Sequence, residues 1–192
     1  MALLNKNFLL EMYGRRQSYL ATDQVEKNHS RKMLKESSEN FSMSKSYDIF
    51  LSHSYDDARI IEQIQKMLID KGYSVYVDWI DDGHLNRSSV DGATAKLLRN
   101  RMDQCHSLIY ITSESATTSV WMPWELGYMD ARTRKVAVAP IVSRTESNFD
   151  GREYLGLYPY LDLSGDSFYI HASIMKYVGL QRWMNGENPE TQ

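Results

Sequence analysis

Short apolar runs alternate with segments of helical periodicity along most of this sequence, and this alternation restricts the fold more than any other feature. Five runs rich in β-branched and aromatic residues predict buried strands, at residues 47–52, 73–78, 106–112, 136–142 and 157–163. The clearest helix follows the first run, where Ile60, Ile64 and Leu68 share one face and Gly72 ends the segment. Further helices are expected at residues 93–102 and 119–133, and a closing helix over residues 169–178.

Strands that alternate with helices in this way form a parallel sheet covered on both faces. The dinucleotide-binding strand order would require Gly-x-Gly-x-x-Gly after the first strand, but the sequence there is Ser52-His53-Ser54-Tyr55. A phosphate-binding Gly-Lys-Ser loop is also absent. We therefore expect a flavodoxin-like three-layer α/β fold, with a five-stranded parallel sheet in the order 2-1-3-4-5.

The first 46 residues differ in character from the rest of the chain. They begin with apolar residues that fit one stripe of a short helix: Leu3, Leu4, Phe8, Leu9, Met12 and Leu20. The sequence then becomes polar, which predicts a linker or a loosely held helix. We divide the chain into an N-terminal helical extension with a polar linker (1–46) and one domain (47–192). The stripe could dock on the domain, mediate self-association or lie on a membrane, and its sparse basic charge favours the first two.

Composition limits the compartment and the partners. The net charge of −3 and the isoelectric point near 6.0 provide no overall attraction to nucleic acid or anionic lipid. Cys105 is the only cysteine, so an internal disulfide and a Cys-rich zinc site are both excluded, as is usual in a reducing compartment. No apolar run approaches the roughly 20 residues of a membrane span. We expect a cytoplasmic protein with no nucleic-acid partner, no membrane and no metal.

Trp121 and Glu125 are four residues apart and therefore lie on one face of the predicted helix over residues 119–133. In a 2-1-3-4-5 sheet, the ligand crevice lies beyond the carboxyl ends of the first and third strands. Because this helix follows the third strand, the topology places the aromatic ring and the carboxylate at that crevice. The alternative is an ordinary helix start, in which Ser119 caps the helix, Pro123 occupies the first turn and Glu125 interacts with the helix dipole.

Other candidate ligands for a substrate lie at the same edge of the predicted sheet. Ser52, His53 and Ser54 end the first strand and could bind phosphate or ribose, or could serve only as loop and cap residues. Trp79, at the start of the long loop after the second strand, could stack on adenine or act in packing. The remaining acidic residues near these strand ends are expected to be solvated surface charges: Asp57, Asp81, Asp82 and Glu114.

Three segments together resemble the Toll/interleukin-1 receptor (TIR) domain family. Residues 47–53 are similar to its first box, residues 71–78 to the run into its second box, and residues 119–126 to its Ser-x-Trp-x-x-x-Glu-Leu segment. The resemblance covers about residues 46–180. The chain lacks the Pro-Gly tip of receptor and adaptor members in the loop at residues 81–87, and it has no clear Phe-Trp third box. It therefore resembles the stand-alone bacterial members, including those of anti-phage systems of the Thoeris kind.

The resemblance implies that Glu125 is the catalytic residue of an enzyme that cleaves NAD. Loss of neutral nicotinamide needs no general acid, so one carboxylate that stabilises the oxocarbenium-like sugar is sufficient, without a metal or other cofactor. The product would be ADP-ribose, or a cyclic ADP-ribose-type signal for a downstream effector. The resemblance also implies homo-oligomers formed through TIR–TIR contacts. The alternatives are a non-enzymatic TIR assembly module and, more distantly, a nucleoside-processing transferase.

Overall fold

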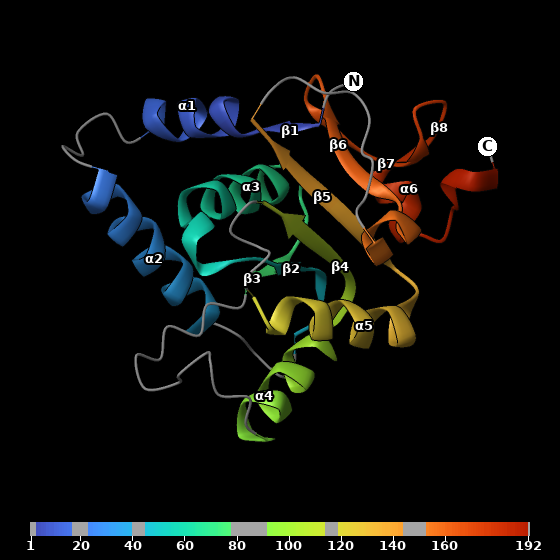
Figure 1. Ribbon diagram of the computed structural model, residues 1–192, viewed down its shortest axis with the longest axis horizontal. Helices are drawn as coiled ribbons and strands as arrows, with labels where there is room; N and C mark the ends of the chain where they lie inside the picture. The colour runs from blue at the N-terminus through green and yellow to red at the C-terminus, as the bar shows by residue number, and fades with distance from the viewer. Residues whose placement is uncertain are drawn as a thin grey trace.

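A largely parallel sheet forms the centre of the computed structural model, which describes residues 3–16, 23–39, 45–77, 92–113, 119–143 and 153–191 (Figure 1). Its parallel strands are β2 (Tyr47–Ser52), β3 (Val75–Val77), β4 (Cys105–Thr112), β5 (Val136–Val142) and β6 (Tyr160–Ser164). They lie in the order β3-β2-β4-β5-β6. This is the predicted order 2-1-3-4-5, so the flavodoxin-like α/β class is confirmed.

The sheet is wider than predicted, with eight strands in the described part of the chain. Strand β1 (Leu4–Asn5) pairs in parallel with Ile141 and Val142 at the end of β5. Strands β7 (Ser167–Ser173) and β8 (Lys176–Gly179) continue from β6 as an antiparallel meander. The five-stranded prediction is therefore correct for the parallel core and incomplete at both ends of the chain.

The predicted closing helix over residues 169–178 is wrong, because these residues form most of β7 and β8. Gly165 turns the chain between β6 and β7 with a φ of 60°, and the chain then returns along β6. Phe168 and Ile170 are buried, which is the two-residue period of a strand. The helix α6 (Leu180–Met184) begins only after this meander, and the segment before β6 is the 3-10 helix η3 (Glu153–Leu157).

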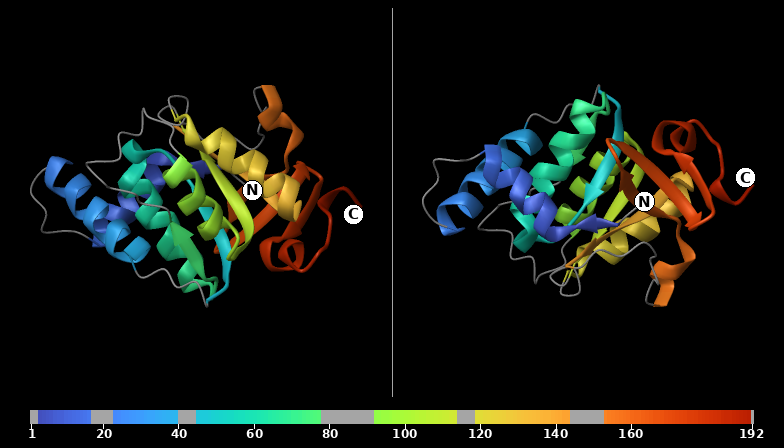
Figure 2. Two further views of the ribbon diagram at one scale, coloured as in Figure 1. Left: turned by 90° about the horizontal axis from the view of Figure 1, so that it is seen from below. Right: turned by 90° about the horizontal axis from the view of Figure 1, so that it is seen from above.

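Helices cover both faces of the sheet (Figure 2). After the 3-10 turn η1 (Tyr55–Asp57), α3 (Ala58–Asp70) packs on one face, with α1 (Lys6–Arg16) and α2 (Asp23–Glu39) against its outer side. On the other face α5 (Trp121–Thr133) packs on β4 and β5, with α4 (Gly92–Met102) beside it. Among the described residues, none of these helices is both long enough and apolar enough to cross a membrane.

The N-terminal segment docks on the domain. Leu3, Leu4 and Leu9 of the predicted stripe are buried, whereas Phe8 is exposed. Part of the polar stretch forms α2, whose Leu34 is buried in the same core cluster as the leucines of β1 and α1. Of the three predicted possibilities for this stripe, the structure shows docking on the domain. The division of the chain at residue 46 stays a prediction.

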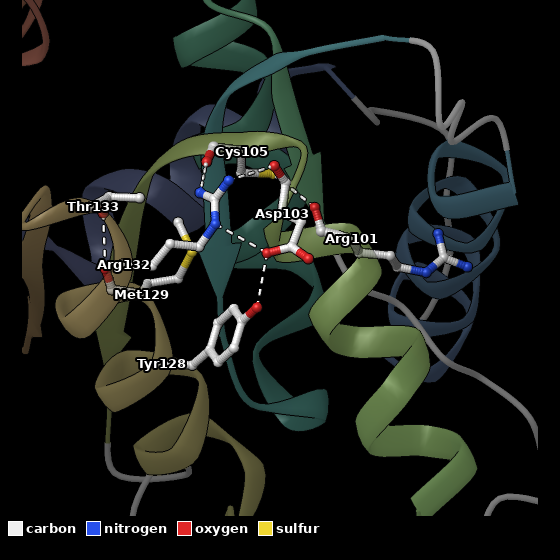
Figure 3. A network of polar contacts seen from close by, with 7 residues as sticks. All are labelled: Arg101, Asp103, Cys105, Tyr128, Met129, Arg132 and Thr133. Carbon is white, nitrogen blue, oxygen red and sulfur yellow. Dashed lines mark hydrogen bonds and ion pairs between the residues drawn. The ribbon is translucent and has the colours of Figure 1, made fainter.

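A polar network fixes α5 against the end of α4 and the start of β4 (Figure 3). Arg132 donates from Nε to the Asp103 carboxylate at 3.0 Å and from a second nitrogen to the Asp103 carbonyl at 2.8 Å. Tyr128 donates its hydroxyl to the same carboxylate at 2.8 Å. Because Tyr128 and Arg132 are one turn apart on α5, these bonds limit both the rotation and the translation of the helix that carries Glu125.

Candidate active site

Ser52 and Glu125 meet at the carboxyl edge of the sheet. Ser52 is the last residue of β2 and Glu125 lies at the start of the second turn of α5, and the Ser52 hydroxyl donates to Oε2 of Glu125 at 2.5 Å. The two side chains are only 1% and 6% exposed. They come together because β2 and β4 are neighbours and α5 follows β4 and packs back on both strands. Glu125 therefore lies at the carboxyl edge of the sheet, beside the last residue of the first predicted strand, and its role in a crevice there stays a prediction.

Trp121 lies one turn before Glu125 and is buried in the core cluster of this face of the sheet. Its ring contacts Trp124 edge to face, with ring centroids 5.6 Å apart, and Trp124 stacks on Tyr128 at 5.8 Å. The backbone N–H of Met122 donates to the Ser119 hydroxyl at 3.3 Å, as expected for an ordinary helix start. The Ser119 hydroxyl therefore accepts one of the first N–H groups of α5 although Val120 is the N-cap residue, and Trp121 and Glu125 lie one turn apart on the helix.

The other predicted ligands are only partly described. His53 and Ser54 are buried next to Ser52. His53 Nδ1 lies 3.0 Å from the carbonyl oxygen of Leu51, and the Ser54 carbonyl accepts the Asp57 N–H at 3.2 Å in the turn into α3. These contacts fix the loop that follows β2. Trp79 lies outside the described residues, as do Asp81, Asp82 and Glu114.

Asp57 is the main site residue that sequence reasoning missed. The prediction of a solvated surface charge is wrong, because this side chain is 6% exposed. It accepts the hydroxyl of Ser113, the residue after β4, at 2.5 Å. Burial raises the pKa of the Asp57 carboxyl above its ordinary value, while the Ser113 hydrogen bond and the charge of Lys6 oppose this rise. The available signal was its place just after the first strand, at the predicted crevice.

Tyr110 is a second residue that the sequence did not single out. It pairs with Ser52 in the register of β4 against β2, and its side chain is buried. Burial raises the pKa of its hydroxyl, and the neighbouring Tyr154 and then the charge of Glu125 raise it further. Tyr110 therefore stays neutral and lies close enough to Glu125 for the two groups to interact. Nothing in the sequence distinguishes this tyrosine from others in the strands.

A cavity of about 590 Å³ lies at the other end of α5. It is lined by residues of the α5 C-terminus, the start of β5 and the C-terminal segment, among them Asp130, Lys135 and Trp183. Lys135 donates to the Trp183 carbonyl at 2.7 Å, and burial lowers the pKa of its ammonium group. Asp130 and Arg134 follow Glu125 by five and nine residues, so the part of the cavity that α5 lines lies roughly 7–13 Å further along the helix axis. Neither Ser52 nor Glu125 lines this cavity, so it is separate from the site described above.

The fold and this site define a class, the flavodoxin-like α/β proteins with a buried glutamate at the topological switch point. The family model described as TIR domain matches residues 49–174 of the chain. One similar protein, named "Probable 3' cyclic ADP-D-ribose synthase ThsB'", from Bacillus cereus (strain MSX-D12), is 43% identical over 166 residues, which are 83% of this chain and 86% of that protein. With both findings, the chain belongs to the TIR domain family.

A second relative is "Putative cyclic ADP-D-ribose synthase TIR2" from Cytobacillus dafuensis. It is 34% identical over 92 residues, which are 47% of this chain and 24% of that protein. Both names describe synthesis of a cyclic ADP-ribose.

Proposed function

We propose that this protein cleaves the nicotinamide–ribose bond of NAD and that Glu125 is its catalytic residue. The observation that carries the proposal is the buried Glu125 carboxylate, fixed by Ser52 at the switch-point crevice. The names of the relatives support NAD as substrate and a cyclic ADP-ribose as product, because both describe cyclic ADP-ribose synthases. The alternative is a TIR module that assembles without catalysis.

The chemistry of this bond matches a site built on one buried carboxylate. When the C–N bond breaks, nicotinamide takes the electron pair and leaves as a neutral molecule, and positive charge develops on the ribose. A carboxylate about 4 Å from this charge gains about 4 kcal/mol at an effective dielectric constant near 20. If this gain occurs only in the transition state, it accelerates cleavage roughly a thousandfold. The Ser52 hydrogen bond holds the carboxylate in one orientation before the substrate arrives.

The remaining predicted ligands would shape the pocket around NAD. We assign Trp121 to the wall beside Glu125, Ser52, His53 and Ser54 to the ribose or phosphate, and Trp79 to the adenine. The same proposal places the protein in the cytoplasm as a homo-oligomer formed by TIR–TIR contacts. Its role would be bacterial anti-phage signalling, in which a downstream effector detects the cyclic product.

The deciding experiment measures nicotinamide release by the full chain and by Glu125→Gln, with the products identified by mass spectrometry. We expect Glu125→Gln to lose about a thousandfold in rate, because its amide carries no charge to stabilise the sugar cation. Glu36→Gln is the matched control and should retain the wild-type rate, since Glu36 is an exposed residue of α2 paired with Lys32. Repeating the assay over a range of protein concentrations tests whether the oligomer is the active form.

Two outcomes would contradict the proposal. Equal nicotinamide release by wild type and Glu125→Gln would remove Glu125 from catalysis. Normal assembly of both proteins without nicotinamide release at any concentration would favour the assembly module.

A further inference from the structure

Asp57 and Glu125 are two buried acids whose hydrogen bonds cross between the ends of β2 and β4. Glu125 follows β4 in the chain, yet it is hydrogen-bonded to Ser52 at the end of β2. Asp57 follows β2, yet it is hydrogen-bonded to Ser113 just after β4. Each carboxylate thus reaches across to the other strand, and both serines lie at the carboxyl ends of the two strands that separate at the switch point.

The two acids come from opposite layers of the fold. Asp57 immediately precedes α3, which packs on one face of the sheet, whereas Glu125 belongs to α5 on the other face. A substrate in the crevice would therefore have one buried carboxyl on each side. Glycoside-cleaving enzymes place two carboxyl groups on opposite sides of the reacting sugar in the same way, and the two groups have different roles.

Cleavage of NAD gives a role to only one of these acids. Nicotinamide leaves without a proton, so departure of the base requires only the carboxylate that stabilises the cation. Cyclisation is different when the nucleophile is a hydroxyl group, because the attacking oxygen must lose its proton. An adenine nitrogen that attacks the same carbon carries no proton and needs no base. A second buried carboxyl at the crevice is therefore useful for a hydroxyl nucleophile and has no such use for a nitrogen.

We infer that Asp57 is the general base of ring closure, accepting the proton of the adenosine ribose hydroxyl that captures the sugar cation. This inference rests on the proposed cleavage of NAD at Glu125. In the balanced step, the C–N bond breaks with its electron pair on nicotinamide, and the hydroxyl oxygen forms the new C–O bond to the same carbon. Its proton passes to the Asp57 carboxylate and then to solvent. Water capture of the cation would give linear ADP-ribose instead.

The surroundings of Asp57 suit this role. Its burial makes the carboxylate a stronger base than an exposed aspartate, since its pKa is raised. The hydrogen bond from Ser113 fixes the side chain and occupies one oxygen. The charged groups that act on it are Lys6 of α1 and the adjacent Asp56, which have opposite effects on its pKa.

The test compares Asp57→Asn with wild type in the ratio of cyclic to linear product formed from NAD. A general base contributes about a hundredfold or more, so the cyclic product should fall by about that factor while nicotinamide release stays within a fewfold of wild type. Glu36→Gln is the control, because Glu36 is an exposed acid of α2 that pairs with Lys32. It should give the wild-type ratio.

The product ratio of the wild-type protein, measured over a series of pH values, distinguishes a general base from a residue with only a structural role. Asp57 accepts a proton only when ionised, so the wild-type ratio of cyclic to linear product should rise as the pH rises through the raised pKa of Asp57. Using a ratio cancels the pH dependence of the cleavage step. Ser113→Ala removes a hydrogen bond that lowers this pKa, so the rise should move to higher pH. Ionisation of the substrate itself should be unchanged between the two proteins.

The other possible results separate the role of Asp57 from the proposed cleavage of NAD. An unchanged product ratio in Asp57→Asn, a wild-type ratio that does not vary with pH, or a cyclic product joined through an adenine nitrogen would overturn the role of Asp57. Nicotinamide release by wild type with linear product alone would do the same and would leave cleavage of NAD standing. Absence of nicotinamide release by wild type would instead refute the proposed function itself.

Discussion

A short contact with the end of another strand helps to orient Glu125. The Ser52 hydroxyl donates to Oε2 of Glu125. Because the carboxylate is planar, this hydrogen bond also restricts the direction in which Oε1 points. A hydrogen bond to a charged group contributes about 1.5–3 kcal/mol when it forms inside a protein. The orientation of the Glu125 side chain therefore depends on β2 as well as on the helix that carries it.

Replacing Ser52 by Ala should lower kcat/KM for nicotinamide release by about ten- to a hundredfold, because the carboxylate loses the donor that orients it. Steady-state kinetics with NAD measure this effect. Ser107→Ala is the matched control, since Ser107 is equally buried in β4 and donates to the Asp48 carbonyl at 2.7 Å. Activity of Ser52→Ala within twofold of wild type would show that the contact does not matter for catalysis.

Glu125 was predictable from sequence and Asp57 was not, for a physical reason. The position of Glu125 follows from topology alone, because the helix after the third strand must start at the carboxyl edge. Whether an acid at a strand end is buried depends instead on what packs over it. The side chain of Asp57 is hydrogen-bonded to Ser113, which is distant in the chain, and the charge of the equally distant Lys6 acts on its pKa. These partners have no pattern in the local sequence around Asp57.

The helix α2 packs on the domain, although its composition does not predict this. Its sequence is largely polar, and few apolar residues mark a buried face. It is nevertheless anchored by Leu34, which is 0% exposed, and by an ion pair between Glu26 and Arg59 of α3 at 2.9 Å. The buried Ser30 and a second ion pair, between Arg31 and Asp56, add to this docking. A single buried leucine leaves too little apolar pattern to predict the docking from sequence.

Leu34→Ala should lower the free energy of unfolding of the whole chain by about 2–4 kcal/mol, because it leaves a cavity between α2 and the core. Denaturant titration followed by circular dichroism measures this value. The adjacent Met33 provides the control: its side chain is 43% exposed, so Met33→Ala should cost less than about 1 kcal/mol. If both variants matched the wild type, α2 would contribute nothing to the stability of the domain.

The closing meander shows the limit of periodicity as evidence. Tyr169, Ile170, Ile174 and Tyr177 have spacings that fit a helix, yet they lie in β7, in β8 and in the turn between them. The helical spacing was accidental, since Ile170 is the only buried residue of these four, and Ile174 and Tyr177 are exposed. Their β-branched and aromatic character favours strands, and Gly165 and Gly179 bound the segment. The composition of this segment is therefore typical of strands, although its spacing fits a helix.

The whole molecule carries at least one buried acid that opposes folding at neutral pH. Asp57 has a folded-state pKa above the 3.8 of an unperturbed aspartate, so the folded state binds its proton more tightly than the unfolded state. Its contribution to stability is therefore greatest below pH 3.8 and is lost as the pH rises through the folded-state pKa. Each unit of such a shift corresponds to about 1.4 kcal/mol.

Asp57→Asn should be more stable than wild type at pH 7, and this advantage should shrink as the pH falls toward 3.8. Asparagine has the same shape, still accepts the Ser113 hydroxyl and carries no charge to bury. Thermal unfolding between pH 3.5 and 7.5 measures the difference, and about 1 kcal/mol would raise Tm by about 2–4 °C in a chain of this size. Glu36→Gln, at an exposed acid of α2, should show no comparable trend. A difference that is constant or grows toward low pH would contradict the raised pKa.

The pairing of β1 with β5 sets an order of events when the chain is made. Leu4 and Asn5 leave the ribosome well before Ile141 and Val142, the residues beside which they finally lie. At about 5–20 residues per second, the delay is on the order of 10 s. Strand β1 therefore cannot pair with β5 until this interval has passed, and it stays unpaired with β5 in the nascent chain until then.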